Sequence, residues 1–181
     1  MSQLTCVALL RGINVGGKNL LPMKDLAVLC ADAGCLNVRT YIQSGNVLFQ
    51  ASPAKAQTLA GLIAKGIADR FGYRTPVLLR TVEELGETIR SNPFPDASED
   101  WLHVLFMADR ADAPRAAALD PDRSPPDAFV VHGREIYLQC PNGVGNTRLT
   151  NAWFDSKLAT ISTGRNWRTV VKLFELARAL P

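Results

Sequence analysis

Long hydrophobic runs are missing from this sequence of 181 residues. The longest apolar stretches, such as residues 7–10 and 104–107, are far shorter than the roughly 20 residues that a membrane-spanning helix requires. The first residues carry no basic segment, and Arg11 interrupts the first apolar run before it could act as a secretory signal. We therefore expect a cytoplasmic protein that has no membrane partner.

Metal-binding and catalytic motifs are also missing. The sequence has no Cys-x-x-Cys pair and no cysteine with a nearby histidine, so zinc-site spacing is absent. It has no nucleophile elbow, zinc-protease signature or paired-carboxylate motif. We predict no metal and no cofactor, and the sequence leaves open whether the protein is an enzyme. Because structural disulfides are rare in a reducing cytosol, we expect four buried, reduced thiols: Cys6, Cys30, Cys35 and Cys140.

The composition is otherwise that of an ordinary folded protein, with 47% hydrophobic and 20% charged residues. The net charge of +3 is unevenly distributed along the chain. Residues 1–80 carry nine Lys/Arg against three Asp/Glu, residues 81–133 four against eleven, and residues 134–181 seven against three. This asymmetry fits a basic surface for anionic partners, although ordinary solvated faces explain it equally well.

The first half of the chain predicts a ferredoxin-like unit. Residues 5–10 are expected to form a strand, residues 23–33 a helix, and residues 38–43 and 46–50 a hairpin that turns at Ser44 and Gly45. Pro53 opens a second helix that ends at Gly72, and residues 76–81 supply a fourth strand. This βαββαβ order, an α/β plait, is predicted to occupy residues 1–82.

The same order is predicted to recur after a linker helix and loop at residues 83–100. Strands are expected at residues 102–107, 128–132, 135–140 and 159–162, and helices at residues 114–119, 147–158 and 166–180. No residue-by-residue repeat relates the halves, so the duplication is expected to be structural only. We predict an α+β fold of two ferredoxin-like units packed together, the second at residues 101–181 with an extra C-terminal helix.

The first candidate site is the glycine-rich loop that follows the first predicted strand. Consecutive glycines let backbone N–H groups converge on an anion, and the loop leads to a helix N-terminus. Its spacing matches neither the dinucleotide-binding fingerprint nor the phosphate loop, so a purely structural loop is an equal alternative. The anion-site interpretation uses Arg11, Gly12, Asn14, Gly16, Gly17 and Lys18.

The second candidate is the predicted hairpin turn, where Gln43, Ser44 and Asn46 could contact a ligand. Turn chemistry explains Ser44, Gly45 and Asn46 without any ligand. Both interpretations stay open at this point.

The third candidate is a basic set near the C-terminus, formed by Arg148, Arg165, Asn166 and Arg168. Asn166 is expected to cap the last helix, with Arg165 and Arg168 beside its positive end. Such an arrangement suits a phosphate or carboxylate. Trp167 would either pack on the body of the protein or stack on a ligand.

Three motifs in this chain together resemble the bacterial domain of unknown function 1697 family: LLRGINVGGKN at residues 9–19, RTYIQSGNV at residues 39–47 and RNWRTV at residues 165–170. The resemblance spans nearly the whole chain and implies two ferredoxin-like halves. It implies no activity, because the family has no assigned reaction. Gly164 stands where the family pattern has Thr or Ser, and residues 147–150 replace its Ser-Lys-Leu-Thr segment.

Our leading hypothesis is a protein that binds a phosphate-bearing or otherwise anionic partner, either a nucleic acid or a phosphorylated small molecule, through a basic cleft. The alternative is an enzyme that acts on a small anionic metabolite in the cleft between the two units, oriented by Asn14, Gln43, Asn46 and Asn166. A scaffold with no concavity is a third interpretation. We further predict that the glycine-rich loop and the Arg-Asn-Trp segment share one site, with Lys18 and Arg165 within about 20 Å of each other.

Overall fold

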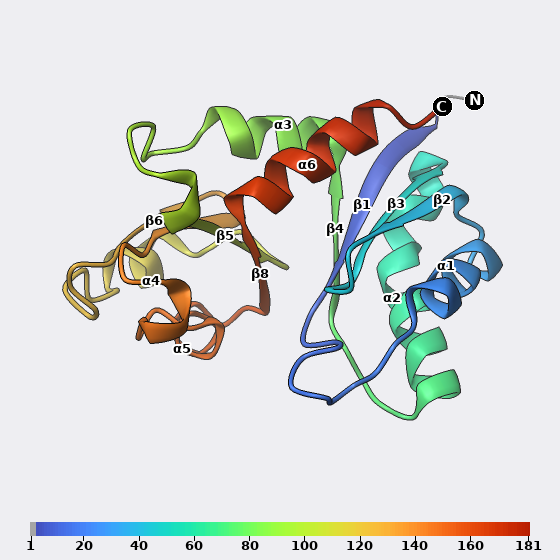
Figure 1. The fold of residues 1–181 in the computed structure, drawn as a ribbon, viewed down its shortest axis with the longest axis horizontal. Helices are drawn as coiled ribbons and strands as arrows, with labels where there is room; N and C mark the ends of the chain where they lie inside the picture. Colours follow the sequence, from blue (N-terminus) through green and yellow to red (C-terminus); the bar gives the residue numbers. More distant parts are fainter. Residues whose placement is uncertain (1–2) are drawn as a thin grey trace. The chain divides into compact units, whose positions relative to one another are not determined.

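The computed structural model describes residues 3–181 and has an α+β fold built on two four-stranded antiparallel sheets (Figure 1). The chain forms two compact units. Unit 1 contains Met1–Glu87 and Lys172–Pro181, and unit 2 contains Thr88–Val171.

Unit 1 contains one four-stranded sheet and two helices on one face of it. Its elements are β1 (Leu4–Leu10), α1 (Met23–Asp32), β2 (Leu36–Tyr41), β3 (Asn46–Ala51), α2 (Pro53–Phe71) and β4 (Val77–Thr81). The strand order is β2-β3-β1-β4 with every neighbouring pair antiparallel. This is the predicted ferredoxin-like arrangement.

The helix α2 follows directly from the sequence. Pro53 opens its first turn, where a missing N–H has no consequence. Leu59, Ile63 and Ile67 recur at four-residue steps and are fully buried. Gly72 ends the helix with φ +76°, a left-handed conformation that costs glycine little, and its N–H donates to the carbonyl of Ala68.

The core of unit 1 lies between the helices and one face of the sheet (Figure 1). Alternate residues of β1, such as Cys6, Ala8 and Leu10, contribute to this core together with the α2 residues. The residues between them, Val7 and Leu9, lie on the opposite face and are also fully buried. Both faces of β1 are therefore apolar, which explains its continuous hydrophobic run.

Unit 2 repeats the strand order of unit 1. Its sheet runs β6-β7-β5-β8, all antiparallel, and corresponds strand by strand to β2-β3-β1-β4. The remaining elements of the chain are α3 (Val82–Arg90), the 3-10 turn η1 (Glu99–Trp101), β5 (Leu102–Met107), α4 (Ala113–Ala117), β6 (Ala128–His132), β7 (Glu135–Gln139), the 3-10 turn η2 (Val144–Asn146), α5 (Asn151–Leu158), β8 (Ser162–Asn166) and α6 (Trp167–Arg178).

Two predicted boundaries in unit 2 were wrong. The helix expected from residue 147 begins at Asn151, because the Thr150 hydroxyl caps it by accepting from the N–H of Trp153 at 3.2 Å. The strand expected at residues 159–162 is instead β8, because Ala159 adopts a left-handed conformation with φ +51° and ends α5. Arg165 and Asn166, expected at the start of the last helix, therefore close a strand.

The last helix is capped as predicted, since Asn166 Oδ1 accepts from the N–H of Thr169 at 2.8 Å. From Lys172 onward the helix belongs to unit 1, whereas the sequence pattern had placed all of residues 101–181 in the second unit. Residues 83–87, expected in the linker, also belong to unit 1.

The structure of residues 3–181 can be compared with two expectations drawn from the composition, the lack of a membrane-spanning helix and the burial of the cysteines. None of the helices in this range has the length and apolarity that spanning a bilayer requires. All four cysteines are free and buried, as predicted.

Candidate anion-binding site

The glycine-rich loop between β1 and α1 folds into a small hairpin. The N–H of Asn14 donates to the carbonyl of Asn19, and the N–H of Lys18 donates to the carbonyl of Val15, both at 3.1 Å. Gly16 and Gly17 form the tip with φ +58° and +73°. Hairpin turns with positive φ at both central residues favour glycine strongly. The paired glycines thus have a structural reason, and they leave their backbone exposed at the tip.

Asn14 fixes this hairpin to the rest of unit 1. Its Nδ2 donates to the carbonyls of Leu21 at 2.9 Å and Gln43 at 2.8 Å, and its Oδ1 accepts from the N–H of Leu21 at 2.8 Å. The bond to Gln43 joins the first sequence motif to the second, 29 residues away. Asn14 therefore clamps the hairpin to the rest of unit 1, and its role in orienting a ligand stays a prediction.

The turn between β2 and β3 is organised from inside by Asn46. The Nδ2 of this fully buried residue donates to the carbonyl of Tyr41 at 3.1 Å and to Ser44 Oγ at 3.0 Å. Gly45 has φ +79°, and a Cβ there would lie 2.7 Å from Leu10 Cβ. Asn46 consequently holds the turn, while Gln43 and Ser44 are on the surface.

A third segment, which connects α2 to β4, meets the hairpin. The N–H of Arg11 donates to the carbonyl of Pro76 at 3.1 Å, and Thr75 Oγ1 donates to the carbonyl of Arg11. Tyr73 Oη donates to the carbonyl of Asn19 at 3.2 Å. Residues 11–21, 42–45 and 72–76 are therefore linked by hydrogen bonds at one end of the sheet, here called the loop end of unit 1.

The loop end of unit 1 carries charge of one sign. Its three segments contain the basic residues Arg11, Lys18 and Arg74 and no Asp or Glu. Lys18 and Arg74 are exposed, Arg11 is half-buried, and Gly12 leaves open space where a Cβ would stand. These segments therefore hold three of the nine basic residues of residues 1–80 and none of the acidic ones.

Apolar side chains are exposed beside these charges. Val15 and Leu20 are each 65% exposed and Ile42 is 48% exposed. Each is adjacent in sequence to Asn14 or to a residue that binds it, so the Asn14 hydrogen bonds keep all three in the same region.

Arg165, one of the C-terminal candidates, is buried in β8 and is only 7% exposed. Its Nη1 donates to Thr163 Oγ1 at 3.0 Å and to the carbonyl of Gly164 at 2.7 Å. Burial lowers the pKa of this guanidinium to about 10. The side chain does not project to the surface beside the helix, where the sequence hypothesis had placed it.

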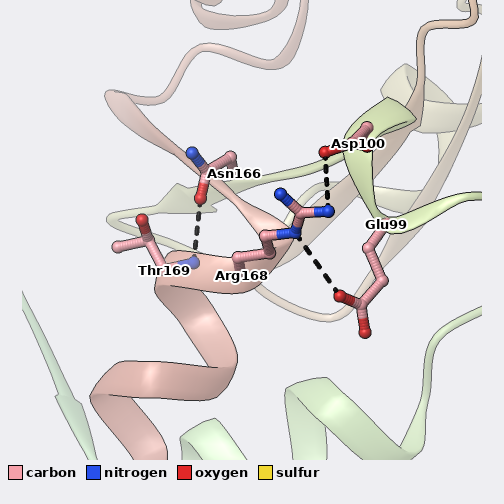
Figure 2. A network of polar contacts seen from close by, with 5 residues as sticks. All are labelled: Glu99, Asp100, Asn166, Arg168 and Thr169. Carbon is pink, nitrogen blue, oxygen red and sulfur yellow. Dashed lines mark hydrogen bonds and ion pairs between the residues drawn. The ribbon is translucent and has the colours of Figure 1, made fainter.

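Arg168 is exposed but already paired with acidic residues of η1, as Figure 2 shows. Its Nη2 lies 3.0 Å from Asp100 Oδ1 and its Nε lies 3.7 Å from Glu99 Oε2. Asn166 is occupied by its capping bond to Thr169 in the same view. An anion at this helix end would have to compete with two carboxylates.

Arg148 has an exposed side chain in the segment before α5. Its backbone N–H donates to Ser124 Oγ at 3.0 Å, and its carbonyl accepts from Arg123 Nε at 3.1 Å. The guanidinium of Arg123 stacks on Trp153, with 4.8 Å to the ring centroid. The backbone of this segment is therefore well fixed, and Arg148 stays a candidate.

The family whose description is "Protein of unknown function (DUF1697)" matches residues 4–137. The chain belongs to this family. The match includes the glycine-rich hairpin and the β2–β3 turn, and it ends before the Arg-Asn-Trp segment of the same DUF1697 protein. No curated protein has significant sequence similarity to it.

A solved structure of a conserved bacterial protein from Streptococcus pneumoniae resembles this DUF1697 member along its whole length. The two share 21% sequence identity and a TM-score of 0.75, with 97% of this chain and 99% of the other covered. At this identity the likeness supports the fold and carries no statement about activity.

Sequence reasoning missed a pair of buried arginines in this DUF1697 member. Arg80 is fourth in β4 and pairs with Val7, and Arg165 is fourth in β8 and pairs with Val104. Each precedes a residue whose side chain caps the next helix, Thr81 or Asn166. One residue-level correspondence therefore relates the halves, and an Arg followed by a capping residue at each strand-to-helix junction was its signal.

A second missed feature is a polar cluster that joins α5 to β8. Ser162 is fully buried, donates to Asp155 Oδ1 at 2.6 Å and accepts from Asn151 Nδ2 at 2.8 Å. Both hydrogen-bonding roles of the hydroxyl are thus used within the fold, and we interpret the cluster as structural.

Proposed function

We propose that the loop end of unit 1 binds a phosphate-bearing or otherwise anionic partner, with a nucleic acid as the best-supported class. The observation that carries this proposal is the convergence of Arg11, Lys18 and Arg74 on three mutually hydrogen-bonded segments that contain no acidic residue. Segments whose charged side chains are all positive attract an external anion.

Rigidity supports the same proposal. The hydrogen bonds of Asn14 and Asn46 hold the hairpin and the turn in place before any ligand arrives, so binding would order few additional groups. The exposed backbone at Gly16 and Gly17 adds N–H groups near Lys18.

The exposed apolar residues favour a nucleic acid over a small metabolite. Val15, Leu20 and Ile42 lie beside the cations on an open surface, where they could contact sugars or base faces while the cations contact phosphates. The other predicted members contribute less to this proposal, because Arg165 is buried and Arg168 is paired with carboxylates. That these residues and Arg148 act together with the glycine-rich hairpin at one shared site stays a prediction.

A pocket in unit 1 favours small-anion binding as a second candidate function. It has a volume of about 550 Å³ and is lined by Ala64, Lys65, Ala68, Asp69, Arg74, Thr75 and Pro76. Arg74 and Lys65 supply positive charge there, but Lys65 is paired with Asp69. The carboxylate weakens the case for an anion in this pocket.

The test compares the variant Lys18→Glu with Lys157→Glu, which makes the same charge change at an exposed lysine of unit 2. Fluorescence anisotropy with single-stranded and double-stranded oligonucleotides at low salt should show binding that Lys18→Glu weakens by about tenfold or more, together with a shallower salt dependence. Lys157→Glu should bind like the wild type. No binding of either probe, or equal losses in both variants, would overturn the nucleic-acid proposal.

Titration with inorganic phosphate separates the second candidate from the first. If the pocket is the site, phosphate should bind with the wild-type affinity in Lys18→Glu and more weakly in Arg74→Ala. If the hairpin is the site, Lys18→Glu should lose affinity for phosphate and oligonucleotide together.

A further inference from the structure

The C-terminal end of α1 brings two cysteines together. Gly34 has φ +92°, its N–H donates to the carbonyl of Ala31 at 2.8 Å, and the N–H of Cys35 donates to the carbonyl of Cys30 at 2.9 Å. This pair of bonds is the Schellman motif, in which the side chains of the first and last bonded residues meet. The meeting residues are usually apolar, and here both are cysteines.

The Schellman motif places the side chains of Cys30 and Cys35 against each other. Cys30 is fully buried and Cys35 is 4% exposed, and both belong to the core of unit 1. The helix cap fixes their backbones in this contact, so a covalent bond between the sulfurs would require little backbone movement.

The pair is electrostatically asymmetric. The hydrogen bond from the Cys30 thiol and the nearby Lys55 ammonium lower the pKa of Cys35, although burial acts in the opposite direction. The end of the Lys55 side chain lies against Gly34, in the space that a Cβ would fill. The bond to Cys35 and burial together raise the pKa of Cys30. Because the thiolate is the nucleophile, Cys35 is the sulfur that reacts first.

We propose that Cys30 and Cys35 form a redox-active thiol pair that a peroxide converts to an intramolecular disulfide. The Cys35 thiolate attacks one oxygen of hydrogen peroxide, the O–O bond breaks, and the departing hydroxide takes up a proton to leave as water. The Cys30 sulfur then attacks the resulting sulfenic acid, and its S–O bond breaks to release a second water as Cys30 loses its proton. Two thiols and one peroxide thus yield one disulfide and two waters, and a dithiol reductant reverses the change by exchange.

Access to Cys35 comes from the edge of the sheet. Cys35 immediately precedes β2, which is an edge strand, and the β2–β3 register is interrupted between Leu36 and Arg39. Asn37 in this interruption has φ +52°, and Leu36 is 51% exposed. An edge strand with an interrupted ladder opens locally at lower free energy than the core, so a small oxidant reaches Cys35 without global unfolding.

The other two cysteines are the internal comparison. Burial raises the pKa of both Cys6 and Cys140 to about 11, which disfavours the thiolate at each. Peroxide should therefore select the Cys30–Cys35 pair.

The test treats the folded full chain with hydrogen peroxide, then unfolds it in denaturant, blocks free thiols with iodoacetamide and digests it with trypsin. Cleavage after Lys24 and Arg39 places Cys30 and Cys35 in one peptide, residues 25–39, without either of the other cysteines. We expect this peptide two hydrogen atoms lighter and unalkylated, while the peptides of Cys6 and Cys140 are alkylated. Alkylation of both cysteines in peptide 25–39, at peroxide levels that oxidise Cys6 or Cys140, would overturn the proposal.

Variants assign the order of attack. Cys30→Ser should lose the disulfide and accumulate a sulfenic acid on Cys35 that dimedone traps, and Cys140→Ser should keep the disulfide.

Because a core substitution can impair folding, Lys55→Gln provides a variant at an exposed position. It should form the same disulfide several-fold more slowly at neutral pH, since the Cys35 thiolate loses a neighbouring cation. An unchanged rate would overturn the assignment of Cys35 as the attacking thiol.

Discussion

The two units share a strand order but differ in the loop that follows their first strand. In unit 1 this loop runs from residue 11 to residue 22 and contains the hairpin, with Lys18 directly after the glycine tip. In unit 2 the loop between β5 and α4 spans only residues 108–112 and contains the charged residues Asp109, Arg110 and Asp112. The strand pairings of the two sheets are equivalent, and the last strand of each sheet has a buried arginine at the same position, Arg80 in β4 and Arg165 in β8. The comparison teaches that the duplicated strands set the scaffold and that the connections set the surface chemistry.

The largest expected effect tests the equivalence of the two buried arginines. Arg80→Ala and Arg165→Ala should each lower the free energy of unfolding by at least about 2 kcal/mol, because a large buried side chain and its hydrogen bonds are lost together. Urea denaturation measures the change, with the exposed Lys157→Ala as control, expected within about 0.5 kcal/mol of the wild type. A near-neutral result at only one arginine would break the equivalence of the units.

The next effect compares two glycines at the loop end of unit 1. Gly45→Ala should destabilise by about 1–3 kcal/mol, because the new Cβ meets Leu10 Cβ and Ile13 Cδ1 in addition to the unfavourable positive φ. Gly16 also has a positive φ, but nothing lies within 4 Å of the position that a Cβ would take. Gly16→Ala should therefore lower the free energy of unfolding by at most about 1–2 kcal/mol, from backbone conformation alone. Thermal melting of both variants checks the order, and an equal or larger loss for Gly16→Ala would contradict it.

A smaller effect concerns the ion pairs of Arg168 in unit 2. Arg168→Ala should change the free energy of unfolding by less than about 1 kcal/mol, since both carboxylates and the arginine are more than half exposed. The difference from wild type should shrink further when salt is added, because exposed pairs are screened. Urea titrations at low and high salt measure both quantities. A loss that grows with salt would show that packing rather than charge dominates at this position.

The smallest effect is a difference in acid sensitivity between the units. Both histidines of the sequence, His103 and His132, lie in unit 2. Burial lowers the pKa of His103 below its ordinary value of 6.5, so the unfolded chain takes up this proton at a higher pH than the folded chain does. The contribution of His103 to stability therefore falls as pH decreases through about 6.5.

Thermal melts at about pH 7.5 and about pH 5.5, which bracket the ordinary histidine pKa, measure this decline. His103→Gln should reduce it, and His132→Gln, at an exposed position, is the matched control. An undiminished decline in His103→Gln would assign the acid sensitivity to other groups.

Much of the scaffold could be predicted because local chemistry and tertiary packing agree there. In α2, Pro53, the buried apolar positions and Gly72 all indicate the same helix. In β8 the residues Ser-Thr-Gly-Arg-Asn have no apolar alternation, so neither the strand nor the burial of Arg165 could be read from them. A strand made of polar residues shows no hydrophobic alternation in its sequence, even when neighbouring strands and helices bury it.

The candidate site was predicted in part. The sequence indicated which segments carry polar and basic residues, but it could not distinguish a ligand-binding amide from a structural one. Asn14 and Asn46 use their side-chain amides within the fold, and the Asn14 bond to Gln43 depends on the antiparallel register that brings the two turns together. The sequence did not indicate Arg74, because the hydrogen bonds that join its neighbours Tyr73 and Thr75 to the glycine-rich loop link residues far apart in the chain. No local sequence pattern predicts such bonds.

The helix α6 has a consequence for how the protein is made. It starts in unit 2 and, from Lys172 onward, belongs to unit 1, where Gln50 Nε2 donates to the carbonyl of Pro181. Domains often fold on the ribosome in the order in which they are synthesised. Unit 1 cannot follow that order to completion, because the sheet and helices of residues 3–87 emerge before residues 172–181 exist. Unit 2 is continuous in sequence, so all of its residues are synthesised before the last residues of unit 1. Synthesis of unit 1 starts first, but its last residues are made after unit 2 is complete.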